Sequence, residues 1–435
     1  MLASEKFRKS SPYKMAIFAA FLILTTNFNL AEVSRFDNYH VYQVQLNSLN
    51  DVNLIKSMED DFTSGFEVLS PVKRKFPQDV NVLVPPHALT DFTSVLDSST
   101  VTYGLVEKNF QDVINQEARM SNLKLINDGY GWDRYYRLEN MHRWMRSLPE
   151  EYPGVVTNVI AGNSYENREL LGLKISHKPG NPAIFFEGGI HAREWISPAT
   201  TTFIANELLT NNDPEVRRLS ETYDWYFFPS VNPDGYVHST NVNRMWRKTR
   251  QPYGICFGAD PNRNWDHHWM EVGASSNPCS QVFAGSSAFS EVETLGLSNF
   301  IASVQDLRLY VSLHSYSQML LYPFGTSDKV EKTEDYDAIS NATVEAIAKR
   351  YGTSYIYGNI EETIYPAAGG SIDWTHGVSK VPMAFTFELR PSRDSFFGFM
   401  LPPNEIVPTG EETFDGVTAM VQEAERRGYM DRNDA

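Results

Sequence analysis

The stretch that decides the fold is residues 183–195, which read AIFFEGGIHAREW. Its four leading apolar residues are typical of a buried strand, and the two glycines permit a sharp turn soon after it. His191 and Glu194 follow that turn three positions apart, so both side chains can face one point. An isolated His-x-x-Glu pair is weak support for a metal site, because both residue types are common on protein surfaces. A metal site at this turn therefore requires a third ligand from elsewhere in the chain.

Short apolar runs of the same kind recur after residue 128, at residues 225–228, 309–313 and 384–387, with aromatic-rich helical segments between them. Strands that alternate with helices predict an α/β domain built on a large mixed, mostly parallel sheet flanked by helices. Since neither an internal repeat nor a low-complexity linker interrupts the sequence there, we expect residues 120–435 to form one domain.

Two of these runs lead directly into a possible ligand or base: His314 follows residues 309–313, and Glu388 follows residues 384–387. Ligands of α/β proteins bind outside the carboxyl ends of the strands, so both side chains can converge with His191 on one crevice. Two neutral imidazoles and one carboxylate suit four-coordinate zinc and leave one position open, which is typical of a catalytic metal. The remaining carboxylate would take a proton from a water molecule that attacks a polarised carbonyl. The pattern predicts metal-assisted hydrolysis.

The region before residue 120 predicts a small α+β open sandwich over residues 35–119, of about 85 residues. The expected strands are residues 40–47, 79–84 and 101–106, and the expected helices are residues 51–61, 87–96 and 108–120. No catalytic cluster is recognisable in its sequence, so the unit is either an accessory domain or an inhibitory prosegment. In the second case, its last helix would offer Arg119 and Met120 to a trypsin-like activating protease.

The N-terminal residues predict export from the cell. Basic residues up to Lys14 precede the apolar run 16–24, which is the pattern of a secretory signal peptide. A membrane anchor is the alternative, but a spanning helix needs about 20 predominantly apolar residues and this run is roughly half that length. We therefore expect residues 1–34 to be the signal, the mature protein to be secreted and extracellular, and no membrane anchor to be present; Met15 could equally be the true start. The triplet at Asn341 is a glycosylation sequon compatible with export.

Composition limits the class of protein further. The 435 residues are 42% hydrophobic and 13% aromatic, which is enough for a large core. The chain carries 38 Lys and Arg against 54 Asp and Glu, and the formal charge of −16 disfavours nucleic acid and anionic lipid as partners. The two cysteines, Cys256 and Cys279, suit one disulfide in an exported protein and would be free thiols in the cytosol.

Several further motifs accompany these residues. They are VNPDG at residues 231–235, NRMWRKTR at 243–250, PNRNW at 261–265, IYPAAGGSIDW at 364–374 and FTFELR at 385–390. Together with the Gly-Gly turn before His191 and the His-Ser-Tyr triplet at His314, they resemble the zinc carboxypeptidase A/B family, in its carboxypeptidase A-like form with an N-terminal prosegment. The resemblance implies a secreted zinc enzyme, made as a zymogen, that removes single residues from the C-termini of peptides and proteins. It also implies a disulfide between Cys256 and Cys279 and an activating cut at Arg119.

The resemblance implies a role for each residue at the predicted centre. His191, Glu194 and His314 would bind one Zn²⁺, the two-His, one-Glu set known from carboxypeptidase A itself. Glu388 would be the general base, and Arg247 would stabilise the negative charge that develops on the scissile oxygen.

Substrate-binding positions follow from the same resemblance. Asn262, Arg263 and Tyr365 would hold the terminal carboxylate of the substrate, which a guanidinium can grip with two parallel hydrogen bonds. The remaining implied positions are Arg193, Ser315 and Tyr316 as further substrate contacts, and Asp260 as the partner that orients His191.

Ile372 occupies the position that sets specificity in the family, where enzymes for basic residues carry Asp. An apolar residue there implies a preference for apolar or aromatic C-terminal residues, which such a pocket binds by apolar burial. Asp373 lies one position later, so a slipped alignment would instead imply a carboxypeptidase B-like preference for Lys or Arg. The Gly-Gly-Ser sequence at residues 369–371 argues against that slip.

Two other functions stay open: a peptide-binding protein that keeps the fold without turnover, and hydrolysis of another acyl bond. A silent relative would typically lack a ligand or the base, and here all are present. Elsewhere, we expect the adjacent His267 and His268 to have surface or packing roles. We expect Lys248 and Arg250 to lie on a solvated face.

Overall fold

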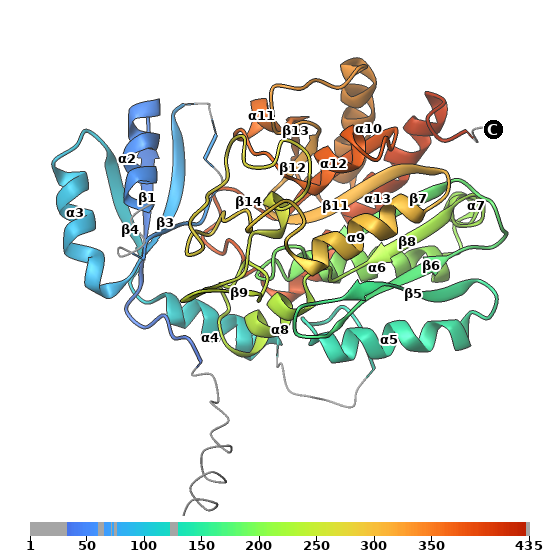
Figure 1. Ribbon diagram of the computed structural model, residues 1–435, viewed down its shortest axis with the longest axis horizontal. Coiled ribbons are helices and arrows are strands. Elements are labelled where there is room, and N and C mark those ends of the chain that lie inside the picture. The colour runs from blue at the N-terminus through green and yellow to red at the C-terminus, as the bar shows by residue number, and fades with distance from the viewer. Residues whose placement is uncertain (1–32, 60–64, 71, 74–75, 122–128, 432–435) are drawn as a thin grey trace, which may run out of the picture. The chain divides into compact units, whose positions relative to one another are not determined.

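The computed structural model describes residues 33–59, 65–70, 72–73, 76–121 and 129–431 (Figure 1). The chain divides after Ser34 into a short N-terminal segment and a compact unit over residues 35–435. The expected signal peptide over residues 1–34 lies outside the described residues, except for its last two positions. Among the described helices, none has the length and apolar character needed to cross a membrane.

The compact unit begins with a small antiparallel sheet covered by two helices, in the order β2-β3-β1-β4. Its strands are β1 (His40–Leu46), β2 (Glu67–Val68), β3 (Gln78–Val84) and β4 (Thr102–Glu107), and the helices are α2 (Leu49–Glu59) and α3 (Leu89–Asp97). Alternate residues of a strand face opposite sides. Val44 and Val82 therefore pack with Ile55 and Phe92 of the two helices, whereas Leu83 faces the other way. The predicted α+β sandwich is confirmed.

Two local details of this part differ from the expectation. The helix expected over residues 87–96 begins as a 3-10 turn, Pro86–Ala88, and becomes α-helical only at Leu89. Pro85 and Pro86 fix this start, because prolines lack the N–H that a regular helix would use. Strand β2 carries no sequence signal, since two residues are too short for a periodicity to show. A further helix, α4 (Phe110–Ser121), follows β4.

The second part is built on an eight-stranded sheet in the order β13-β12-β14-β11-β7-β8-β6-β5. The strands are β5 (Val156–Asn163), β6 (Glu169–Ile175), β7 (Ala183–Gly188), β8 (Asp224–Phe228), β11 (Leu307–Ser317), β12 (Met319–Tyr322), β13 (Ile356–Asn359) and β14 (Met383–Ser392). Four of the seven neighbouring pairs are parallel, including the central run from β14 through β11 and β7 to β8. The predicted mixed, mostly parallel sheet is confirmed.

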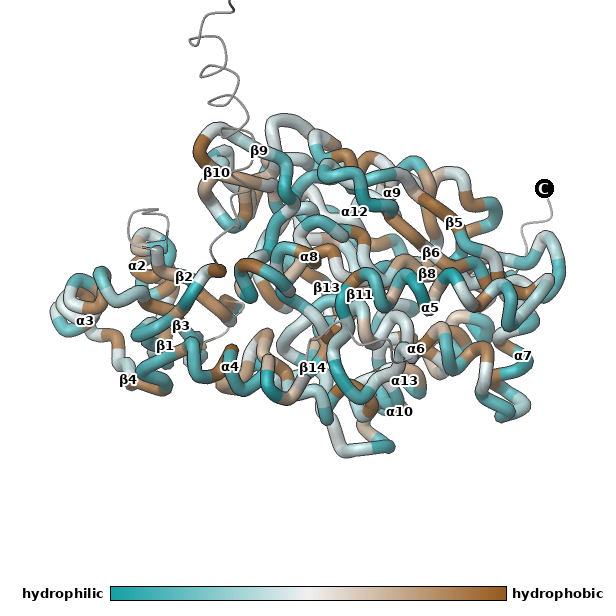
Figure 2. The backbone as a smooth tube through the Cα atoms, turned by 90° about the horizontal axis from the view of Figure 1, so that it is seen from below, coloured by the Kyte–Doolittle hydropathy of each residue, from teal (hydrophilic) through white to brown (hydrophobic). Residues whose placement is uncertain are grey.

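Helices cover both faces of this sheet (Figure 1). They are α5 (Leu138–Glu151), α6 (Ile196–Thr210), α7 (Pro214–Thr222), α8 (Pro233–Asn241), α9 (Val292–Ser303), α10 (Thr333–Tyr351), α11 (Ile360–Thr363), α12 (Ser371–Gly377) and α13 (Ile406–Arg426), with 3-10 turns at Pro261–Arg263 and Pro403–Glu405. Along β7, Ile184 and Phe186 pack with α6 and α13, whereas Phe185 packs with α9 on the opposite face. Burial on both faces explains why the central strands are continuous apolar runs. Figure 2 shows hydrophobic chain along β5 and β6 and mainly hydrophilic chain around α7.

Candidate active site and metal centre

The turn after β7 places the first two candidate ligands. Gly189 adopts a left-handed conformation (φ 66°), and a Cβ there would lie 2.9 Å from the carbonyl oxygen of Pro229, so only glycine fits. The chain then passes through His191 and Glu194 before α6 begins at Ile196. The sharp turn expected from the sequence is therefore present.

The other two candidates lie side by side on neighbouring strands. His314 of β11 and Glu388 of β14 are register partners in the parallel pair at the centre of the sheet. The expectation that both strands end at these residues is wrong, because the pairing continues as far as Ser317 and Ser392. The two polar side chains thus project from continuous strands, and β12 pairs with the Thr386–Glu388 part of β14.

Donor atoms of His191, Glu194 and His314 converge on one buried point, all within 4.8 Å of one another. Nδ1 of His191 lies 2.8 Å from Glu194 Oε1 and 3.1 Å from Nδ1 of His314, which in turn lies 3.1 Å from Glu194 Oε2. Zinc held tetrahedrally at 2.0–2.1 Å would separate its ligand atoms by roughly 3.3 Å. The three donors therefore fit a zinc ion in both chemical type and spacing.

Asp260 lies on the far side of His191 and connects it to Arg247. Its Oδ1 lies 3.1 Å from Nε2 of His191, and its Oδ2 accepts a hydrogen bond of 2.8 Å from Nη2 of Arg247. Burial opposes ionisation of Asp260, but Arg247 and His191 outweigh it and hold the pKa of this carboxyl well below its usual range. A carboxylate behind a ligating histidine fixes the orientation of the ring and raises its basicity.

A guanidinium and a carboxyl lie beside the ligands. Arg247 Nη1 is 3.9 Å from Glu194 Oε1, so its positive charge lies beside the three candidate ligands. Loss of hydration raises the pKa of Glu388; the positive charges of His314 and Arg247 oppose this shift, and the negative charge of Glu194 adds to it. A divalent cation at the three candidate ligands would lower that pKa again and favour the ionised carboxylate, which is the form that a general base requires.

The expected carboxylate-binding residues also meet. Arg263 Nη2 donates to the hydroxyl of Tyr365 at 3.4 Å, and the Oδ1 of Asn262 accepts from the backbone N–H of Ser371 at 2.9 Å. Asn262 Nδ2 lies 3.5 Å from Nε2 of His314, which places this group next to the metal cluster. Ile372 follows directly in α12 and is buried.

Two of the three further contacts expected for substrate are occupied by the first part of the chain. Arg193 forms an ion pair with Glu67 of β2, and the hydroxyl of Tyr316 lies 3.3 Å from Ser70 Oγ. The third, Ser315, instead donates its backbone N–H to Glu194 at 3.2 Å. Glu67 and Ser70 could not be singled out from the sequence, because their significance depends on contacts with distant residues.

A buried ion pair joins α4 to Arg244, which lies after α8 in the part built on the eight-stranded sheet. Arg244 donates to both carboxylate oxygens of Glu117 at 2.6 and 2.8 Å and lies over the ring of Trp195. Glu117 falls on the apolar stripe of Phe110 and Val113 and is 3% exposed. That spacing is a signal from which its burial could have been predicted.

The basic stretch around Arg247 corrects one expectation. Lys248 is buried and donates its Nζ to the carbonyl of Pro278 at 2.7 Å. Arg250 lies over the rings of Trp246 and Phe257, 4.6 and 4.8 Å from their centres. The prediction that Lys248 and Arg250 lie on a solvated face is wrong. A carbonyl oxygen and two aromatic rings replace the water contacts that these cations lose on burial.

The disulfide expected from the family resemblance is present. Cys256 and Cys279 are bonded, with their Cα atoms 5.3 Å apart. The bond ties a short hairpin of β9 (Pro252–Tyr253) and β10 (Cys256–Phe257) to the loop that follows the carboxylate-binding residues.

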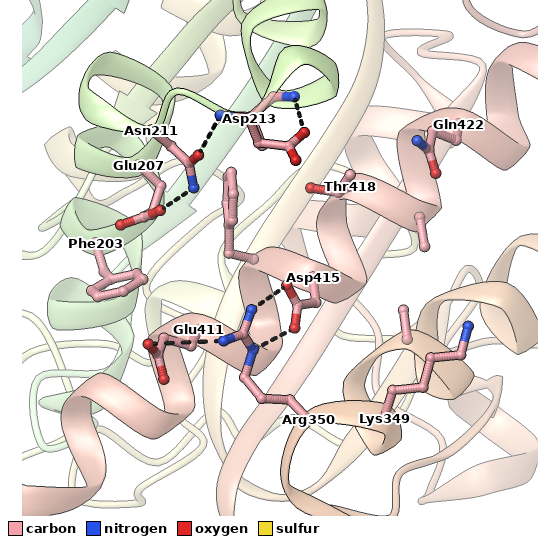
Figure 3. A pocket seen from close by; sticks show the side chains of 14 residues that line it. Phe203, Glu207, Asn211, Asp213, Lys349, Arg350, Glu411, Asp415, Thr418 and Gln422 are labelled. Atoms are coloured by element: carbon pink, nitrogen blue, oxygen red, sulfur yellow. Dashed lines mark hydrogen bonds and ion pairs between the residues drawn. The ribbon is translucent and has the colours of Figure 1, made fainter.

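A hollow of about 510 Å³ lies between α6, α7, α10 and α13 (Figure 3). Several of its polar side chains are paired with each other, among them Arg350 with Asp415 and Asn211 with Glu207. None of the candidate ligands lines it, and we assign it no role in the chemistry.

Comparison with known proteins bears on the whole chain. A family model for zinc carboxypeptidase matches residues 141–416, and one for carboxypeptidase activation peptide matches residues 42–117. Zinc carboxypeptidase A 1 of Anopheles gambiae is 47% identical over 416 residues, which are 95% of this chain and 95% of that protein. Carboxypeptidase B of Astacus astacus is 44% identical over 292 residues, which are 66% of this chain and 95% of that protein. The crystal structure of carboxypeptidase A from Helicoverpa armigera is 29% identical and superimposes with a TM-score of 0.82, covering 90% of this chain and 98% of its own.

Proposed function

Because the chain belongs to the zinc carboxypeptidase family, we propose that it is exported as an inactive precursor and, once cut, releases apolar or aromatic residues from peptide C-termini. The observation that carries this proposal is the convergence of the three candidate ligands with Glu388 at the centre of the sheet, with the candidate carboxylate-binding group beside them. Such an arrangement suits hydrolysis of the last peptide bond of a chain.

Zinc is the cofactor of this family, and the donor set fits it. We assign His191, Glu194 and His314 to hold it, with Asp260 orienting His191. When bound, zinc supplies a Lewis acid that polarises the scissile carbonyl and makes water easier to deprotonate.

The protein groups then carry the proton and stabilise the charge. Glu388 accepts a proton from the attacking water as the water oxygen bonds to the carbonyl carbon. It returns that proton to the amide nitrogen as the C–N bond breaks, so the products are an amino acid and a shortened peptide. The guanidinium of Arg247, held in place by Asp260, stabilises the charge that develops on the carbonyl oxygen.

Recognition of a free C-terminus falls to Asn262, Arg263 and Tyr365. Arg263 contacts Tyr365, and the Asn262 amide lies next to His314, so a carboxylate bound by this group would place the last peptide bond near the three proposed ligands. An internal peptide segment has no carboxylate to offer there, which accounts for exopeptidase action.

A preference for apolar residues is supported by the state of Asp373 as well as by Ile372. Asp373 is buried, accepts from the backbone N–H of Gly325 at 2.8 Å, and burial raises its pKa to about 7. One oxygen, Oδ2, is thus engaged by the backbone, Oδ1 has no hydrogen-bond partner among the described residues, and burial favours the neutral carboxyl, which is a poor partner for a Lys or Arg side chain of the substrate. The carboxypeptidase B-like alternative would require Asp373 to leave this contact.

Inhibition by the first part of the chain is supported by its contacts. Glu67, Ser70 and Glu117 engage Arg193, Tyr316 and Arg244, respectively. Cleavage after the exposed Arg119, near the end of α4, by a trypsin-like protease would separate these residues from the catalytic part. Export is supported by the expected signal at residues 1–34 and by the disulfide, since disulfides persist mainly in oxidising compartments.

The test uses the full chain before and after limited trypsin treatment. Release of Phe, Leu, Lys and Arg from N-blocked dipeptides is followed with and without 1,10-phenanthroline. We expect Phe and Leu release only after trypsin and only without chelator. Release of Lys or Arg instead would overturn the proposed preference for apolar residues. Full activity before trypsin treatment would overturn the proposal that the precursor is inactive.

A further inference from the structure

A second group of potential metal ligands lies outside the proposed active site. One donor atom each from His267, His268 and Asp328 lies within 4.8 Å of the others; we call these residues the loop cluster. The two histidines follow the 3-10 turn Pro261–Arg263, and Asp328 belongs to the loop after β12. His267 stacks on Phe324, in agreement with the expected packing role, but the meeting with Asp328 was not foreseen.

The backbone turns both histidines toward the same side. Neighbouring side chains of an extended chain point in opposite directions. His268 instead adopts a left-handed conformation (φ 51°), which is costly for a residue with a Cβ. As a result the two imidazole rings lie 4.5 Å apart at 77° to each other, and both can reach Asp328.

The contacts of His268 resemble those of a ligating histidine. Its Nδ1 lies 2.5 Å from Glu271 Oε2, and its Nε2 lies 2.8 Å from Asp328 Oδ2. A carboxylate that holds one ring nitrogen and leaves the other for a metal is the usual arrangement around zinc. In the active site Asp260 has the same relation to His191.

His267 supplies the second nitrogen. Its Nε2 lies 3.8 Å from Asp328 Oδ2, and its Nδ1 is buried without a hydrogen-bond partner among the described residues. Two imidazoles and one carboxylate are borderline ligands that suit zinc.

We propose that His267, His268 and Asp328 bind a second divalent transition-metal ion, with zinc as the first candidate. The ion would tie the loop of the two histidines to the loop of Asp328 and would act as a structural brace. This proposal stands independently of the function assigned to the active site.

The brace would act on the segment that carries the substrate pocket. The carbonyl of His267 accepts from the N–H of Gly369 at 3.1 Å, and the N–H of Ala367 donates to Gly325 at 2.7 Å. Both bridged loops are therefore bonded to residues between Tyr365 and Ile372. Metal binding at the loop cluster would restrict the movement of that segment.

The experiment counts zinc sites in the full chain, purified without a histidine tag and stripped of metal by a chelator. Zinc chloride is titrated by calorimetry into wild type, His314→Gln and His268→Gln, with His177→Gln as a control histidine outside both clusters. We expect two sites in wild type and in the control, and one in each of the other variants. Asp328→Asn, a milder change, should lose the same site as His268→Gln.

Thermal unfolding gives a second readout. Micromolar zinc should raise the Tm of His314→Gln, in which only the loop cluster is complete, and should have no such effect when His268→Gln is added to it. One site in wild type that His268→Gln leaves intact would overturn the proposal and leave the loop cluster as a hydrogen-bonded group. Loss of the tight site in His268→Gln with its retention in His314→Gln would instead contradict the proposed active site.

Discussion

The active-site cluster of His191, Glu194 and His314 and the loop cluster offer the same donors in different surroundings. Side chains of the first are 5%, 4% and 2% exposed, whereas those of His267, His268 and Asp328 are 11%, 34% and 43% exposed. The first is held by strands and a fixed turn at the centre of the sheet, with donors about 3 Å apart; the second joins two loops and is looser.

The difference in surroundings shows that a suitable set of donor atoms is not enough to make a bound metal ion catalytic. Around the active-site cluster, Arg247, Glu388 and the proposed carboxylate-binding residues lie close to the buried ligands, where electrostatic stabilisation is strong. The loop cluster has a different setting: its side chains are partly exposed, and its two loops are hydrogen-bonded to Ala367 and Gly369. The same chemistry is therefore assigned to catalysis in one place and to bracing in the other.

The largest expected effect comes from replacing Glu388, the proposed general base beside the active-site cluster. Glu388→Gln should lower kcat by about 10²–10⁴-fold, because general-base assistance is lost while the metal ligands stay intact. The measurement is kcat on a blocked Phe dipeptide, together with zinc content. Retained activity with zinc bound would remove Glu388 from the mechanism.

The carboxylates behind the histidines give a matched pair of variants. Asp260→Asn should weaken zinc at the active-site cluster by about 10–100-fold, as expected for a buried partner of a ligating histidine. Glu271→Gln should weaken zinc at the loop cluster by less, because Glu271 is exposed and water can replace it. Calorimetric titration of both variants measures the two losses, and equal losses would contradict the role given to burial.

The first part of the chain should protect one cluster more than the other. Chelator should extract zinc from the active-site cluster about tenfold more slowly before the activating cut than after it, since local opening is then needed. Zinc at the half-exposed loop cluster should leave at a similar rate in both forms. Stopped-flow mixing with a chromophoric chelator gives these rates.

The ion pair of Glu117 with Arg244 should control how fast chelator extracts zinc from the uncut chain. Glu117→Gln leaves the buried Arg244 without its counter-charge and should bring the extraction rate of the uncut chain toward that of the cut one. Asp112→Asn, on the exposed side of the same helix, is the matched control. If both variants behave like wild type, the Glu117–Arg244 pair does not hold the prosegment in place.

The smallest expected effect concerns Asp373 of α12, which accepts a hydrogen bond from Gly325 in the loop that also carries Asp328. Burial raises its folded-state pKa from 3.8 to about 7, so the folded state binds more protons than the unfolded state between these values. The contribution of Asp373 to stability is therefore full below pH 4 and is lost as the pH rises through 7. Asp373→Asn should show a shallower fall of Tm between pH 5 and 8, measured by calorimetry on the cut protein. An unchanged slope would mean that Asp373 does not titrate in this range.

Much of the fold could be predicted because the central strands are buried on both faces and read as unbroken apolar runs, as at residues 183–186. The convergence of His314 and Glu388 was expected from the apolar runs that lead into both residues, although the strands pair with each other and continue past them. Strand β2 and the burial of Lys248 could not be predicted, since both depend on partners far away in sequence. The loop cluster was missed for a similar reason: adjacent histidines point apart unless tertiary contacts impose a left-handed turn.

The most direct test of the central claim compares kcat of His314→Gln and His268→Gln after trypsin treatment, each with its zinc content. The account predicts that both variants lose one zinc, that His314→Gln loses activity, and that His268→Gln keeps kcat near the wild-type value. Activity that disappears with His268 and survives the loss of His314 would contradict it.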